Sequence, residues 1–249
     1  PKSSIECASL PLPTQFPPSQ RADIKSLTPP DSTPTPTSDS PRGVAGGMRD
    51  AFEGLRYVFG TKWLWISTLV SALASVGFAG AMWVSLPRLV HDVYGTGVWL
   101  IGAMATTDAI GSILAALIIG NAGKLQRRGV VAYTATMVGG FALVACALPL
   151  PRPVEPVVAI VASSLVGFGV ATFMIIWGTL QQEKVPNDML GRVSSITQLG
   201  IASTLPGGLV LAGLLADHIG PAQVFAFGGI LAVVPAVVAL GIRDIRRLE

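Results

Sequence analysis

Residues 98–120 read VWLIGAMATTDAIGSILAALIIG, an apolar run whose single ionisable side chain, Asp108, lies near its middle. About 20 apolar residues in a helix cross the ~30 Å hydrocarbon layer of a bilayer. A carboxylate at that depth costs roughly 2.5–3.5 kcal/mol, and such acids usually face a bundle interior or a water-filled cavity. The run therefore predicts a membrane-spanning helix that carries a functional acid.

The rest of the chain repeats this apolar pattern. Of its 249 residues 51% are hydrophobic and 12% are charged, with a mean hydropathy of +0.61, whereas soluble domains carry about 25% charged residues. Six segments of spanning length are expected at 63–86, 98–119, 130–148, 157–180, 193–215 and 221–242. Because backbone groups in lipid must be satisfied internally, these segments should be helices. The predicted fold class is an all-α membrane protein with six transmembrane helices.

The flanking segments have other compositions. Residues 1–47 are rich in Pro, Ser and Thr, which predicts a disordered linker. Residues 48–62 predict an amphipathic juxtamembrane helix, and residues 243–249 a basic tail. Lys and Arg collect in the N-terminal flank, in the second and fourth connections and in the tail, which predicts that both ends of the bundle are cytoplasmic.

The sequence offers little that could support catalysis. Its two histidines, His91 and His218, fall in connections, and its two cysteines, Cys7 and Cys146, lie far apart. No phosphate-binding glycine loop or metal-ligand spacing occurs. We expect no catalytic residue, no metal site, no cofactor and no nucleic-acid partner.

Asp108 has three possible roles. No Lys or Arg lies within the expected spans to neutralise it, so it must be protonated, hydrated, bound to a cation or paired with another part of a larger protein. It could carry a coupling proton, attract cationic substrates, or be a structural acid bonded to Thr106, Thr107 or a neighbouring helix.

Other polar residues at membrane depth are candidates for the lining of a cavity. They are Thr107, Thr172, Gln198 and Thr204. The alternative role for such residues is hydrogen bonding between helices. The tryptophans near the ends of spans are predicted to be interfacial anchors, and they are Trp63, Trp65, Trp83, Trp99 and Trp177.

Two further groups could take part in movement. The first should kink or loosen the fifth span, and it consists of Pro206, Gly207 and Gly208. The second could form a cytoplasmic gate, and it consists of Arg127, Arg128, Asp188 and Arg192. The alternatives are a static kink and a charged, solvated turn, within which Asp188 could pair with Arg192 four residues later.

The chain carries a faint internal repeat. ATTDAIGSILAALIIG (105–120) aligns with IASTLPGGLVLAGLLA (201–216), so that Asp108 falls opposite Thr204. Three spans followed by three related spans have opposite topologies, which is the inverted-repeat pattern of secondary transporters.

Three stretches resemble a known family. MRDAFEGLRYVFGTKWLW (48–65), LQQEKVPNDMLGRVSS (180–195) and GNAGKLQRRG (120–129) are similar to segments of major facilitator superfamily exporters of the macrolide, multidrug and enterobactin-exporter types. The loop at 120–129 lacks the acid found in the stronger form of the family motif.

The resemblance implies the C-terminal half of a twelve-helix transporter, with the N-terminal six-helix half missing. Its implied function is secondary active, proton-coupled efflux of small amphipathic drug-like molecules or siderophores across a bacterial inner membrane. The implied partners are membrane lipid, the missing half, a small-molecule substrate and protons. The alternatives are a six-span permease subunit of another transporter class and a non-transporting truncated membrane protein.

Overall fold

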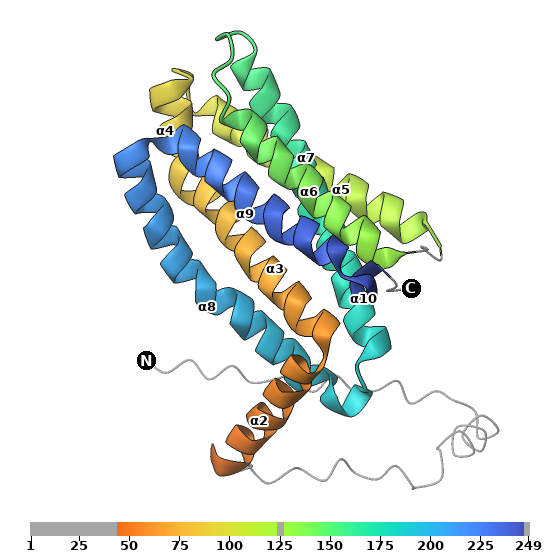
Figure 1. Ribbon diagram of the computed structural model, residues 1–249. Coiled ribbons are helices and arrows are strands. Elements are labelled where there is room, and N and C mark those ends of the chain that lie inside the picture. Colours follow the sequence, from red (N-terminus) through yellow and green to blue (C-terminus); the bar gives the residue numbers. More distant parts are fainter. Residues whose placement is uncertain (1–43, 124–126, 247–249) are drawn as a thin grey trace, which may run out of the picture. The chain divides into compact units, whose positions relative to one another are not determined.

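The computed structural model describes residues 44–123 and 127–246, in which no strand occurs. The elements are α2 (Val44–Gly60), α3 (Lys62–Ala79), η1 (Gly80–Ser85), α4 (Leu86–Arg88), η2 (Leu89–Val93), α5 (Trp99–Asn121), α6 (Arg128–Cys146), α7 (Glu155–Lys184), α8 (Asn187–Ile219), α9 (Pro221–Gly241) and α10 (Arg243–Arg246). The two elements labelled η are π-helical. Figure 1 shows the long helices side by side, roughly along one direction.

Six helical segments in the described ranges are long and apolar enough to cross a membrane. The first of them is composite, because α3, η1, α4 and η2 run without interruption from Lys62 to Val93. The other five are α5, α6, α7, α8 and α9. The predicted class, an all-α membrane protein with six spans, is confirmed.

The packing of the helices follows the expected inverted repeat. Helix α3 packs against α8 and α9, while α7 packs against α5 and α6, and α6 packs against α9. The first helix of each triplet therefore contacts the second and third helices of the other triplet. Figure 1 shows α3, α8 and α9 on one side and α5, α6 and α7 on the other.

Small residues allow the helix backbones to approach closely. A Cβ added to Gly77 of α3 would strike the backbone carbonyl of Gly228 of α9, and a Cβ added to Gly228 would meet Gly77 in the same way, 2.5 Å from its carbonyl oxygen. In lipid, close packing of this kind holds helices together, because the hydrophobic effect gives no preference for helix contact over lipid contact.

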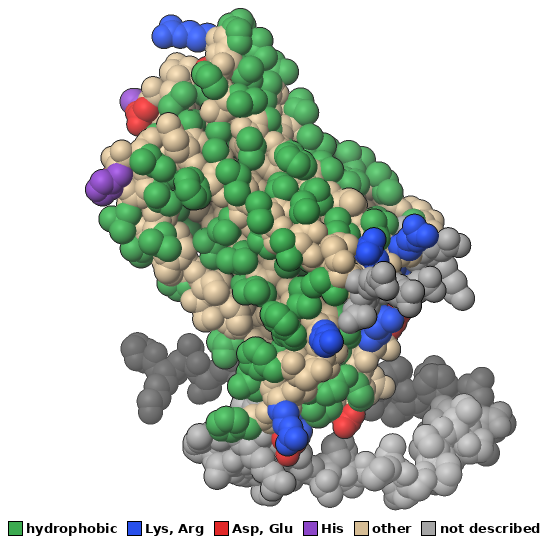
Figure 2. Space-filling model, viewed as in Figure 1, with side chains coloured by type: hydrophobic (Ala, Val, Ile, Leu, Met, Phe, Trp, Pro, Cys, Tyr) green, Lys and Arg blue, Asp and Glu red, His purple; other side chains and the backbone are tan. Residues whose placement is uncertain are grey.

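The helix ends at the basic side of the bundle enclose an aromatic cluster. Trp177 of α7 is only 8% exposed, so it is a buried residue and not the interfacial anchor that was predicted. Its ring stacks on Phe173 at 6.1 Å and meets Trp63 edge-on at 5.6 Å. Figure 2 shows Lys and Arg side chains gathered near this end, around α10 and α2, while apolar side chains cover the flanks.

Candidate functional site

Asp108 opens onto a cavity of about 600 Å³ between the first span, α5 and α7. Its polar lining consists of Asp108, Ser75, Ser112 and Ser163. The walls are otherwise apolar and aromatic, and they include Phe78, Met82, Trp83, Met104, Val166, Val170 and Leu205. A largely apolar pocket with a few polar groups is the usual form of a small-molecule site.

The Asp108 carboxylate is half-buried on α5. It lies against Gly167 of α7, where an added Cβ would be 2.9 Å from Oδ1 of Asp108. Among the described residues, no hydrogen bond or ion pair engages this carboxylate. A charged carboxylate in such surroundings is costly unless water, a proton or a cation satisfies it.

Two hydroxyl groups fasten α5 to α7 on either side of Asp108. Thr107 Oγ1 lies 3.0 Å from the carbonyl oxygen of Ile160 on α7, and 3.1 Å from each of the carbonyl oxygens of Ala103 and Met104 on its own helix, so its one proton is shared among these three acceptors. Ser112 Oγ donates to the carbonyl oxygen of Gly167 at 3.2 Å. Thr107 therefore links two helices, which was the alternative to its predicted place in the cavity lining. The two contacts place Asp108 beside α7.

The first span contributes residues that sequence reasoning did not assign to the site. Trp83, predicted to be an interfacial anchor, lines the cavity and remains 69% exposed. It belongs to the π-helical segment η1 together with Met82. Such π-helical turns occur often at functional sites. No residue type is diagnostic of a π-helix in a sequence. Apart from the aromatic side chain of Trp83, nothing in the sequence therefore indicated that this segment forms a wall of the cavity.

Three of the predicted lining residues lie elsewhere. Thr172 is 1% exposed on α7 and does not reach the cavity, and Gln198 is exposed on α8. Thr204 lines a second groove of about 830 Å³ between α2, α3 and α8. Thr204 aligns with Asp108 in the internal repeat of the sequence. The two aligned positions therefore occupy separate places.

The residues predicted to form a cytoplasmic gate lie at the ends of the helices. Arg127 precedes α6 with a left-handed backbone, φ 60°. Arg128 pairs with Glu183, which joins the start of α6 to the end of α7. Arg192 Nη1 lies 3.0 Å from Oε2 of Glu53. Asp188 is exposed in the first turn of α8.

The predicted kink residues fall inside α8, which is helical from Asn187 to Ile219 through Pro206. Gly207 has open space around it, whereas a Cβ on Gly208 would collide with Val76 of α3. Gly208 thus allows α8 to approach α3. Kinking or loosening of α8 at this point stays a prediction.

Comparison with known proteins identifies the family. The family model described as "Major Facilitator Superfamily" matches residues 24–207. The chain is 27% identical over 202 residues to macrolide efflux protein A of Streptococcus pyogenes, covering 81% of this chain and 49% of that protein. A serotype M6 strain carries a relative with the same identity and coverage.

The chain thus spans about half the length of the curated relatives it matches. No solved structure matches it. With six spans and a match to the family model over most of its length, the chain belongs to the Major Facilitator Superfamily and corresponds to half of that family's fold.

Proposed function

We propose that this chain is the C-terminal half of a proton-coupled exporter and that Asp108 carries the coupling proton. The observation that supports this most directly is a half-buried carboxylate that opens onto a cavity of about 600 Å³ without a cationic partner among the described residues. The name of the relatives, macrolide efflux protein A, favours efflux of small amphipathic drug-like molecules, and siderophores are a second substrate class.

The chemistry follows from the surroundings of Asp108. In an apolar cavity a carboxylate is stable as the protonated acid, and it is stable as the anion when water or a cation stays beside it. Exchange between these two states would let a proton enter the cavity as a substrate leaves. The six-helix bundle would rock against the N-terminal six-helix half around this cavity.

A second role for Asp108 is attraction of cationic substrates. The cavity that holds its carboxylate is also lined by Trp83 and Phe78. Aromatic faces and a carboxylate together suit an organic cation with an apolar body. If this alternative holds, transport of cationic substrates would require Asp108, whereas transport of neutral substrates would not.

We infer a multi-pass protein of the bacterial inner membrane with both ends of the bundle in the cytoplasm. Basic residues at one end of the bundle support this orientation: they include Lys62, Arg128, Lys184 and Arg192, whereas Arg88 and Arg152 are at the other end. Cysteines introduced at Thr96 and Gly123, in connections at opposite ends, would test it. We expect an impermeant thiol reagent added outside cells to label only the cysteine at position 96.

We also propose which parts of the bundle take part in the movement. The Arg128–Glu183 and Arg192–Glu53 pairs join elements at the basic end of the bundle, where they would open and close with the bundle. Pro206 and its two glycines would let α8 bend during this movement, since proline lacks the N–H that would bond to the preceding turn.

The decisive experiment compares Asp108→Asn with the natural protein in its full length, reconstituted into vesicles. We expect drug-dependent proton flux to be abolished while membrane insertion stays normal. The matched control is Asp92→Asn, because Asp92 is an exposed acid near the end of the first span. Full proton flux in Asp108→Asn would exclude a coupling role. Loss of transport for cationic compounds alone, with neutral compounds still driven by protons, would favour substrate attraction.

A further inference from the structure

One face of α3 presents a row of serines to the bundle interior. Ser67, Ser71 and Ser75 are four residues apart, so they lie on one side of the helix. Ser67 is 2% exposed and Ser71 is 4% exposed. Four residues of helix rise about 6 Å, roughly twice the length of an O–H···O hydrogen bond. One water molecule between neighbouring hydroxyls would therefore span each gap.

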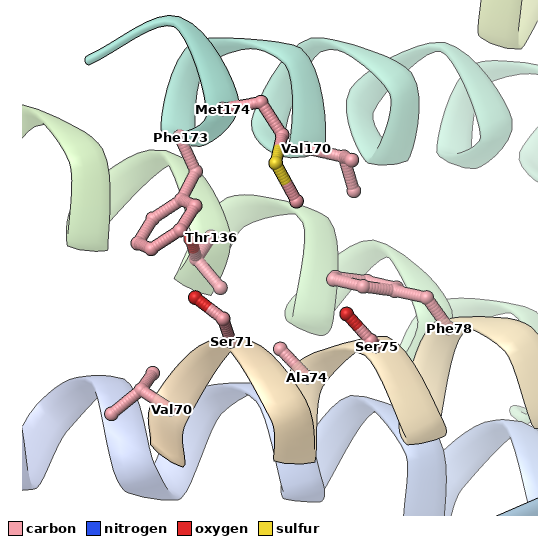
Figure 3. Close-up of a pocket in the computed structure, with 9 residues that line it drawn as sticks. All are labelled: Val70, Ser71, Ala74, Ser75, Phe78, Thr136, Val170, Phe173 and Met174. Atoms are coloured by element: carbon pink, nitrogen blue, oxygen red, sulfur yellow. The ribbon is translucent and has the colours of Figure 1, made fainter. Parts of the chain in front are cut away.

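A small cavity of about 30 Å³ lies beside this row, between α3, α6 and α7. Figure 3 shows the hydroxyl groups of Ser71 and Ser75 directed from α3 into this space, with Thr136 and Phe173 on its other sides. A volume of about 10–15 Å³ already accommodates one water molecule. The cavity therefore has the size for one or two ordered waters.

The polar groups around this cavity favour water. Ser71 Oγ is fully buried and has no hydrogen-bond partner within the described part of the chain. Thr136 Oγ1 donates its hydrogen to the carbonyl of Ala132 at 3.1 Å, which leaves its lone pairs free to accept. Because an unsatisfied buried hydroxyl is costly, a water that donates to Thr136 and bonds to Ser71 would stabilise the fold.

The serine row connects two regions of the bundle. At one end, Ser75 lines both the small cavity and the cavity that holds Asp108. At the other end, Ser67 Oγ and the Tyr133 hydroxyl lie 2.6 Å apart, and each residue is 2% exposed. Tyr133 is five residues beyond Arg128, which places this pair toward the basic end of the bundle.

We propose that Ser75 and Ser71, joined by ordered water in the small cavity, form a proton path with the Ser67–Tyr133 pair from the Asp108 cavity toward the basic end of the bundle. Ser67 does not line the small cavity, so a further water between Ser71 and Ser67 would complete the path. This rests on the proposed function, because it supplies the route for the proton that Asp108 exchanges. Each oxygen along the path accepts a proton on a lone pair while its own proton passes to the next oxygen. At the far end, water at the basic end of the bundle takes the proton that leaves the Tyr133 hydroxyl, so no side chain ends the transfer with a changed charge.

The first test uses the full-length transporter, with both six-helix halves, reconstituted into vesicles. Ser71→Val would fill the cavity with apolar atoms, and Tyr133→Phe would remove the last hydroxyl. We expect each to slow net proton-driven efflux about five- to tenfold, comparable with the loss of one hydrogen bond. In both variants, exchange of substrate across the vesicle membrane, which moves no net protons, should keep the rate of the natural protein.

The matched control is Thr68→Val on the same helix. The Thr68 hydroxyl bonds to the carbonyl of Leu64 at 2.8 Å and lies on the groove side of α3. Unchanged net efflux in both Ser71→Val and Tyr133→Phe would overturn the path. An equal fall of exchange and net efflux would also overturn it, because the residues would then act only in folding or substrate binding.

The second test detects the water itself. Phe173 lines the small cavity and is only 6% exposed, so radiolytic hydroxyl radicals should modify it only if water is bound beside it. We expect modification of Phe173 in the natural protein and its loss in Ser71→Val. An unmodified Phe173 in the natural protein would exclude the water and with it the path.

Comparison with Asp108→Asn separates the two proposals. If Asp108→Asn abolishes coupling while Ser71→Val and Tyr133→Phe are normal, the path fails and the proposed role of Asp108 stands. If Asp108→Asn couples fully while both path variants are slow, the proposed role of Asp108 fails and the path serves a proton from another group.

Discussion

Gly167 of α7 faces Asp108 of α5 so closely that any side chain at position 167 would strike the Asp108 backbone carbonyl. The absence of a side chain at one residue thus sets how near the acid lies to the neighbouring helix. The contact ties the position of the proposed proton carrier to the packing of α5 on α7, so perturbing the packing should perturb the site.

Gly167→Ala tests this contact. The added methyl group must push α5 from α7, and overpacking of this kind costs about 1–3 kcal/mol. We expect a lower apparent midpoint of thermal unfolding in detergent, together with reduced proton-coupled transport. Gly178→Ala on the same helix is the control, because nothing lies within 4 Å of a Cβ there. If the two variants unfold at the same temperature, the close approach at Gly167 does not constrain the bundle.

Thr107→Val tests the hydroxyl link beside Asp108. Valine keeps the shape of threonine but removes the bond to the Ile160 carbonyl, and such bonds in membrane bundles contribute about 0.6 kcal/mol on average. We expect a small loss of stability in urea or thermal unfolding. Thr106→Val is the matched control, because its hydroxyl bonds only within α5, to Gly102 at 2.8 Å. A larger loss in Thr106→Val than in Thr107→Val would contradict the assigned role.

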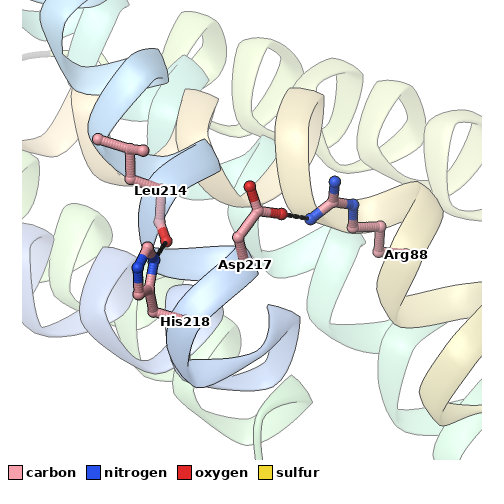
Figure 4. Close-up of polar contacts among 4 residues, drawn as sticks. All are labelled: Arg88, Leu214, Asp217 and His218. Carbon is pink, nitrogen blue, oxygen red and sulfur yellow. Dashed lines mark hydrogen bonds and ion pairs between the residues drawn. The ribbon is translucent and has the colours of Figure 1, made fainter.

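The Arg88–Asp217 ion pair joins the end of the first span to the end of α8 (Figure 4). Its side chains are 50% and 56% exposed, so solvent and salt should screen it strongly. We expect Asp217→Asn to lower stability slightly at low salt and not at all at high salt. The exchanged pair Arg88→Asp with Asp217→Arg should restore the low-salt value. A salt-independent loss would mean that Asp217 acts through another contact.

Tyr94 follows the first span and should ionise only in strong alkali. Burial, and then the negative charges of Cys146 and Glu155, raise the pKa of Tyr94 above its usual value of about 10. The neutral phenol is favoured in the folded protein, so the contribution of Tyr94 to the free energy of unfolding is fully present below about pH 10. Because the pKa is higher in the folded state, this contribution is lost as the pH rises through the folded-state pKa.

Phenolate absorbance during an alkaline titration provides the measurement. Tyr94→Phe should remove one late-ionising phenol and the hydrogen bond from its hydroxyl to the Cys146 carbonyl, 2.8 Å long. Tyr57→Phe is the comparison, because Tyr57 lies in α2, which precedes the first span. An ordinary titration of Tyr94 in the folded protein would contradict its burial.

Much of the architecture could be predicted from local sequence. Six apolar runs predicted six spanning helices, because a backbone in lipid can satisfy its hydrogen bonds only within such helices. The alignment of residues 105–120 with 201–216 predicted the inverted repeat, and the packing of α3 and α7 against the opposite triplets agrees with it. Asp108 was found from sequence because one charge in a long apolar run is conspicuous.

The faces of the helices could not be predicted in the same way. A helix that is apolar all round has no polar side from which its orientation can be deduced. The sequence therefore could not show that Thr107 points at α7 or that Thr172 is enclosed. Nor could it show that Gln198 is exposed on α8 and that Thr204 lines a separate groove.

The sequence by itself determined the number of spans, their apolar character and the place of Asp108 near the middle of its apolar run, since these depend on composition along one helix. Only the tertiary structure decided which groups share the cavity with Asp108, because those contacts join residues distant in the chain, such as Gly167 and Trp83. The serine row of α3 shows both contributions. The four-residue spacing of its serines can be read from the sequence. The cavity beside Ser71 exists only because α6 and α7 pack against the serine-bearing face of α3.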